Sequence, residues 1–130
     1  MIDDHLYSFL TNQSSITSLV STRIYPQILP QEPVYPAITF RQDSHDYEET
    51  FEGQGGMTDS YYSIDAWAKT FAEAMSIGNA VRAAMQNTVG GFGGINIHRC
   101  VVSNGPISVY EDAVEGYRQT HVFLIRHNEG

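Results

Sequence analysis

The fold is decided in residues 61–85, which read YYSIDAWAKTFAEAMSIGNAVRAAM. Its first part alternates with a period of two, which is typical of a strand. One face of this strand carries Tyr62, Ile64, Ala66 and Ala68, and the other carries Tyr61, Ser63, Asp65 and Trp67. Thr70 to Glu73 has the spacing of a capping box, which predicts that a helix begins there and runs to about Asn87. Its apolar stripe consists of Phe71, Ala74, Met75, Gly78, Val81 and Met85.

Upstream of this unit the chain predicts two short helical pieces and an extended connector. An amphipathic helix opens the chain, with Ile2, Leu6, Phe9 and Leu10 on one face. Ser14 and Ser15 offer an N-cap for a second turn that carries Ile16, Leu19 and Val20. Residues 23–26 are expected to be extended. Three prolines, Pro30, Pro33 and Pro36, make the next stretch a stiff connector.

The remaining segments predict strands. Ala37 to Gln42 is rich in β-forming residues, and Ile95 to Ser103 follows a glycine run at 90–94 that we interpret as a connector. Asn104-Gly105 is a tight-turn signal, so Pro106 to Tyr110 is expected to return as a hairpin partner. In the last strand, Tyr117 to His127, the run Val122 to Ile125 indicates burial on both faces. The predicted fold is α+β: a mostly antiparallel sheet of four to six strands packed against two main helices.

Residues 43–56 stand apart in composition. They hold Asp43, Asp46, Glu48, Glu49 and Glu52, no Lys or Arg, and three glycines. Little apolar area is available there to offset the entropy of ordering the chain. We expect a flexible acidic loop that becomes ordered when the protein docks on its partners, and we treat its five carboxylates as possible interface residues.

Composition limits the classes of function. The chain has 130 residues, of which 42% are hydrophobic, so we expect a single domain over residues 1–130. Its formal net charge of −8 repels phosphate groups, so nucleic acid and anionic membranes are poor partners. No apolar run is long enough for a membrane span, and Asp3 and Asp4 replace the basic start of a secretory signal. We expect synthesis in the cytosol.

The sequence offers no convincing catalytic, cofactor or metal site. The glycine run follows a helix and precedes a strand, which is the reverse of a phosphate-binding loop. The five histidines are scattered, and the acidic residues lack the spacing of a calcium loop. Cys100, the only cysteine, lies within a predicted strand, where a buried thiol is more usual than a nucleophile. We expect no enzyme activity, cofactor or bound metal.

Tyr61 and Trp67 are large aromatic residues whose apolar surface must be buried by another part of the structure. The helix is expected to pack on the opposite face of their strand, which leaves two large aromatic side chains on the second face. Either a second core layer or a subunit interface would bury these two side chains, and the sequence does not decide between the two.

Several segments resemble a family of small bacteriophage tail proteins, the tail-completion and tail-terminator proteins of long-tailed phages, including terminators of the lambda type and head-to-tail joining proteins. The opening segments 6–10, 23–26 and 35–40 look like that family in order and spacing. The strand-then-helix unit Tyr62 to Thr70 and Ala80 to Met85 is similar to its central signature.

The resemblance implies a structural virion protein assembled in the host cytoplasm. It implies a homo-oligomeric ring, sixfold, at the head-proximal end of the tail. This ring binds the tail-tube protein and the head connector or stopper protein, and it ends tube growth, joins tail to head, or does both. Two alternatives stay open from the residues alone: a small-ligand-binding or hydrolytic α+β domain, and a host interaction module of the same fold.

Overall fold

The computed structural model describes residues 2–27, 29–30, 33–47, 57–86, 90–92 and 95–128. Its six strands form one sheet in the order β1-β2-β3-β6-β5-β4, in which every pair is antiparallel except β1 and β2. The predicted α+β class and mostly antiparallel sheet are confirmed. The elements in chain order are α1 (Ile2–Thr11), α2 (Ser14–Val20), β1 (Ile24–Pro26), β2 (Ala37–Tyr47), β3 (Met57–Ala68), α3 (Phe71–Met85), β4 (Gly90–Phe92), β5 (Ile95–Glu111), the 3-10 turn η1 (Asp112–Val114) and β6 (Gly116–Asn128).

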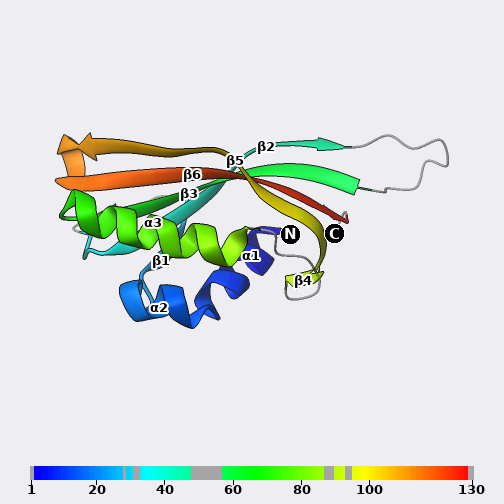
Figure 1. Cartoon of the computed structure of the whole chain (residues 1–130), viewed down its shortest axis with the longest axis horizontal. Helices are drawn as coiled ribbons and strands as arrows, with labels where there is room; N and C mark the ends of the chain where they lie inside the picture. Colours follow the sequence, from blue (N-terminus) through cyan, green and yellow to red (C-terminus); the bar gives the residue numbers. More distant parts are fainter. Residues whose placement is uncertain are drawn as a thin grey trace.

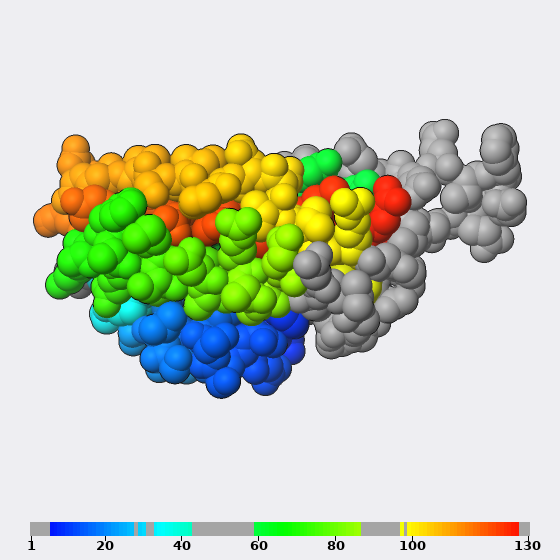
Figure 2. All heavy atoms as spheres, in the orientation of Figure 1, coloured from blue at the N-terminus to red at the C-terminus, as the bar shows by residue number. Residues whose placement is uncertain are grey.

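All three α-helices lie on the same side of the twisted sheet (Figure 1). Helix α3 packs against β3 and β6, and α2 packs on α3. In the view of Figure 2, α3 lies between the β5 side of the sheet and the N-terminal helices. The core therefore consists of one face of the sheet and the helical side chains above it, among them Leu6, Leu10, Ile16, Tyr62, Ile64, Val81, Phe123 and Ile125.

The strand-to-helix unit forms as its sequence predicts. Thr70 caps α3, because its hydroxyl oxygen accepts a hydrogen bond of 3.2 Å from the Glu73 backbone N–H. The four apolar residues of the β3 face are buried. The predicted stripe of α3 is partly wrong, because Phe71 and Met75 are 46% and 40% exposed, while Ile77 is buried in their place.

Gly78 sets how closely α3 approaches the sheet. A Cβ atom at this position would lie 2.1 Å from Gln119 Oε1 and 3.2 Å from His121 Cε1, both on β6. A larger residue here would have to displace the Gln119 side chain, so glycine favours the close approach of α3 to β6.

β6 is a central strand, paired with β3 on one side and β5 on the other. Phe123 and Ile125 face the helices and are buried, whereas Val122 and Leu124 on the other face are only half-buried. The prediction of burial on both faces is wrong for this second pair, because no described helix lies on that side.

The predicted hairpin at Asn104-Gly105 does not form. β5 continues through this point to Glu111, and the turn to β6 is instead made by η1. Asn104 faces Val122 while Ile107 faces Thr120, so the register shifts by one residue and β5 bulges. Gly105 has φ of +115°, a conformation that suits a bulge as well as a tight turn.

Three other predictions need correction. Gly90–Phe92, expected in a connector, pairs with β5 as β4. Ser14 and Ser15 do not cap α2, because Gln13 occupies the N-cap position and makes no side-chain capping bond. Residues 43–47 of the expected acidic loop belong to β2, paired with β3 as far as Tyr47 and Thr58. Residues 48–56 lie outside the described residues.

Candidate functional site

The face of the sheet that points away from the helices is the candidate site, and we call it the open face. Its residues are identified by register, because residues directly opposite on neighbouring strands point to the same side. Tyr61 on β3, Leu124 on β6 and Val101 on β5 form one such row across three strands, and all three side chains are half-buried. The open face therefore carries apolar surface that no described helix covers.

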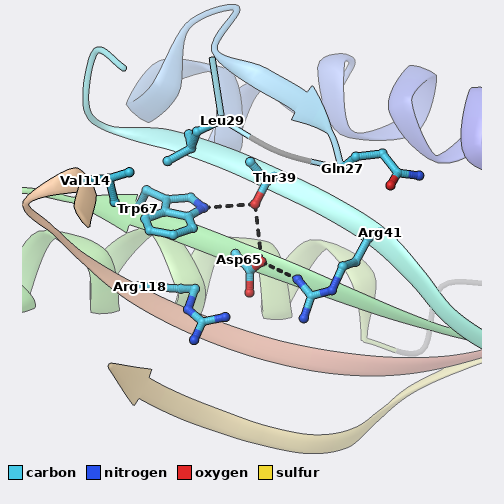
Figure 3. Close-up of a pocket in the computed structure, with 8 residues that line it drawn as sticks. All are labelled: Gln27, Leu29, Thr39, Arg41, Asp65, Trp67, Val114 and Arg118. Atoms are coloured by element: carbon cyan, nitrogen blue, oxygen red, sulfur yellow. Dashed lines mark hydrogen bonds and ion pairs between the residues drawn. The ribbon is translucent and has the colours of Figure 1, made fainter. Parts of the chain in front are cut away.

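A pocket of about 270 Å³ lies on the open face near the start of β2 and the end of β3. Figure 3 shows Thr39 linked to both the Trp67 indole and Asp65, and Asp65 linked to Arg41. The Arg118 side chain lies near the indole. The lining residues are Gln27, Leu29, Thr39, Arg41, Asp65, Trp67, Val114 and Arg118.

Asp65 organises the polar side of the pocket. Its carboxylate is 2% exposed and accepts hydrogen bonds from Arg41 at 2.7 Å, from Thr39 at 3.3 Å, and from the Thr120 hydroxyl. A buried charge needs such partners. Because its oxygens are engaged by three donors, Asp65 is a structural anchor and a poor candidate for a general base.

Trp67 and Arg118 form the other side. The indole Nε1 donates to Thr39 Oγ1 at 2.9 Å, which ties the ring to the Asp65 network. The guanidinium carbon of Arg118 lies 5.9 Å from the centre of the indole ring, within the range of a cation–π contact. Arg118 also donates through NH2 to Glu111 at 3.3 Å, but its buried Nε has no hydrogen-bond partner among the described residues.

The end of the pocket is held by the connector between β1 and β2. The Tyr35 hydroxyl donates to the Val114 carbonyl at 2.6 Å. Gly116 permits this contact, since a Cβ there would lie 2.9 Å from the Tyr35 ring. Burial raises the pKa of Tyr35, with a further contribution from the nearby carboxylate of Glu115.

The structure separates the residues predicted as an interface. Trp67 lines the pocket and Tyr61 lies further along the open face. Asp43 and Asp46 belong to β2: Asp43 follows the pocket residue Arg41 by two positions, and Asp46 lies near the far end of the strand. Glu48, Glu49 and Glu52 lie outside the described residues. Arg41 and Arg118 were missed by sequence analysis. Each follows an aromatic residue in a predicted strand, but the pairing that brings the two strands together cannot be derived from that local pattern.

The helix-covered face holds chemistry of another kind. Cys100 is buried, and this burial raises the pKa of its thiol to about 12. Burial lowers the pKa of His121, and the positive charge of Arg82 lowers it further. In the part of the chain that the structure describes, no three His, Cys, Asp or Glu side chains gather as a metal site. Among the same residues, no helix is long and apolar enough to cross a membrane.

Comparison with known proteins gives one family match. A family model described as tail completion protein gp17 matches residues 4–117. A solved structure described as the virion of a native gene transfer agent particle contains a chain with a similar fold. The likeness covers 95% of this chain and 92% of that chain, with a TM-score of 0.71 and 17% sequence identity. At this identity the likeness shows the fold alone. Among curated proteins, none matches the sequence.

Proposed function

The chain belongs to the tail completion protein gp17 family, and from this premise we propose that it closes the head-proximal end of a tail as a homo-oligomeric ring. As a family member it is a structural protein of the phage tail and part of the virion. The ring, its sixfold symmetry and its role at the end of the tube are the proposal.

The observation that carries the proposal is the one-sided sheet. Helices cover one face, while the open face presents Tyr61, Val101, Leu124 and the Trp67 pocket. Large aromatic side chains with a polar handle, such as Tyr61 and Trp67, favour subunit contacts. A closed ring requires two different surfaces on each copy, because its contacts are head-to-tail. The open face supplies one of them.

The mechanism consists of binding and geometry. A ring seated on the last ring of tail-tube protein covers the surface on which the next tube ring docks, so polymerisation ends there. The opposite side of the ring binds the connector or stopper protein of the filled head. Neither step breaks a covalent bond, so the proposed role requires no catalytic residue, cofactor or metal.

The test is electron microscopy of lysates from a phage or prophage that lacks this gene. Tail length and head attachment are scored in the same particles. Overlong tails of irregular length would establish tube termination, whereas tails of normal length lying apart from DNA-filled heads would establish joining. Normal infectious virions would overturn the tail function.

Within the proposed ring, we place Trp67 and Tyr61 at the subunit contact. Trp67→Ala should abolish ring formation, measured on purified tails, with only a modest decrease in melting temperature. A lower melting temperature with unchanged ring formation would instead assign Trp67 to the core of the subunit.

A further inference from the structure

The pocket on the open face is a local concentration of positive charge in an acidic protein. The chain carries a formal net charge of −8, yet two arginines and a single carboxylate line this pocket. Asp65 is held by Arg41, Thr39 and Thr120, and its ion pair with Arg41 balances one of the two positive charges, so Arg118 supplies the excess. The side chains of Arg41 and Arg118 are 39% and 26% exposed, which leaves both guanidinium groups within reach of a ligand.

Arg118 is suited to a further acceptor. A guanidinium has five N–H donors in a planar fork that matches a carboxylate. The bond to Glu111 uses only NH2, and this ion pair is partly exposed on both sides, so it is weak and readily exchanged. The neighbouring Trp67 ring holds the guanidinium from one side. The chemistry that fits this site is a carboxylate side chain.

The chain also carries an acidic segment whose charge is opposite to that of the pocket arginines. This segment directly follows the end of β2 that lies away from the pocket. β2 starts at the pocket with Thr39 and Arg41 and ends at Tyr47, directly before Glu48, Glu49 and Glu52. Figure 1 places the β2–β3 end of the sheet opposite the turn between β5 and β6. From Thr39 to Tyr47 a strand extends about 26 Å at its usual rise per residue.

In one subunit, the paired strands β2 and β3 separate the pocket from the start of the acidic segment. Antiparallel pairing of β2 with β3 continues to Tyr47 and Thr58, so the segment that joins them starts at the far end of the sheet. A pocket at one end of the sheet with carboxylates following the other end is the arrangement of a head-to-tail contact between copies.

We propose that the Arg41–Trp67–Arg118 pocket of one copy binds carboxylates of residues 48–52 from the neighbouring copy. This inference rests on the proposed ring and names the contact that closes it. The occupant is a second copy of this chain, because the positive pocket and the acidic segment are complementary in charge and belong to opposite ends of the same strand.

The experiment is complementation of a phage that lacks the gene, with the full chain supplied from a plasmid. One variant reverses the pocket charge, Arg118→Glu. The other reverses the segment, Glu48→Lys with Glu49→Lys and Glu52→Lys. Each alone should lower the titre of infectious particles about a hundredfold, because an unpaired interface charge weakens binding by that order. Arg118→Gln, which removes the charge without reversing it, should lie between Arg118→Glu and the wild type.

Rescue separates a direct contact from a folding defect. In a ring in which the two variants alternate, the pocket with Arg118→Glu meets the segment with the three lysine substitutions, and the native pocket meets the native segment. Co-expression should therefore restore the titre to within about tenfold of wild type, and so should one chain carrying both changes. Lys69→Glu, a reversal at an exposed site outside the pocket, is the matched control and should complement fully.

Either of two results would overturn the contact: wild-type titre from one of the single reversals, or loss of titre with both and no rescue in either combination. Failure of the proposed function is distinguishable, because a phage without the gene would then form normal virions with no plasmid at all.

Discussion

The two faces of the sheet differ in how far their side chains are buried. On the helix-covered face, Phe123 and Ile125 of β6 are fully buried under α3 and the N-terminal helices. Their immediate neighbours Val122 and Leu124 point to the open face and stay half-buried. Adjacent residues of one strand thus differ in role: those on the covered face stabilise the subunit, and in the proposed ring those on the open face provide apolar surface for contact. Substitutions that act on one face only can test this difference.

Phe123→Ala should have the largest effect on stability. Removal of a fully buried aromatic ring leaves a cavity, and the free energy of unfolding should fall by about 3 to 5 kcal/mol. Urea unfolding followed by circular dichroism measures this loss. Leu124→Ala, one residue along, should cost clearly less because that side chain is already partly exposed. Equal losses at the two positions would contradict the division between the faces.

Asp65→Ala should have the next largest effect. It removes the acceptor shared by Thr39, Arg41 and Thr120, and the free energy of unfolding should decrease by about 2 to 3 kcal/mol, discounted because Arg41 is partly exposed. Asp59→Ala is the matched control on the same strand. Its pair with Arg126 is partly exposed on both sides, so the loss there should stay below about 1 kcal/mol. A reversed order would show that the pocket network contributes little.

Thr70→Ala tests the covered face without touching its packing. The hydroxyl oxygen that caps α3 is lost, so the free energy of unfolding should decrease by about 1 kcal/mol. Complementation of the gene-deleted phage should stay at the wild-type level. Loss of complementation with an unchanged melting temperature would place α3 in the assembly surface as well.

The smallest effect should come from pH. Burial lowers the pKa of His121 in the folded state below its usual value near 6.5, so the unfolded chain takes up the proton first. The stability this group confers is therefore complete above pH 6.5 and is lost as the pH falls towards the lowered pKa. Melting temperatures recorded between about pH 7.5 and 5.5 should show this decline, and His121→Leu should flatten it. The same decline in the variant would exclude His121 as its cause.

Local signals in the sequence were enough for the central unit. The alternation of β3 and the cap at Thr70 depend on residues close in the chain, so the strand and the start of α3 are predicted correctly. The turn predicted at Asn104-Gly105 is wrong because a glycine with positive φ serves a tight turn and a β-bulge equally well. Only the pairing of β5 along β6 decides between them, and that pairing is not local.

The candidate site was predicted only in part. Trp67 was recognised because an aromatic residue on the second face of a covered strand needs a cover. Arg41 and Arg118 escaped notice because they are 77 positions apart in the chain and meet only through the order β2-β3-β6. Asp65 was assigned to the correct face, but its three donors come from β2 on one side and β6 on the other. Their convergence follows from the register of the sheet, which no local pattern in the sequence specifies.

The most direct test replaces a leucine by glutamate on each side of the molecule, once on the open face and once on the helical side. Leu124 lies on the open face and Leu19, 39% exposed, lies on α2 of the helical side. Leu124→Glu and Leu19→Glu are each supplied to the gene-deleted phage, and titre and melting temperature are measured for both. We predict that Leu124→Glu folds but does not support the formation of infectious particles. Leu19→Glu should fold and should also support the formation of infectious particles. Full titre with Leu124→Glu would contradict the assignment of the open face to assembly.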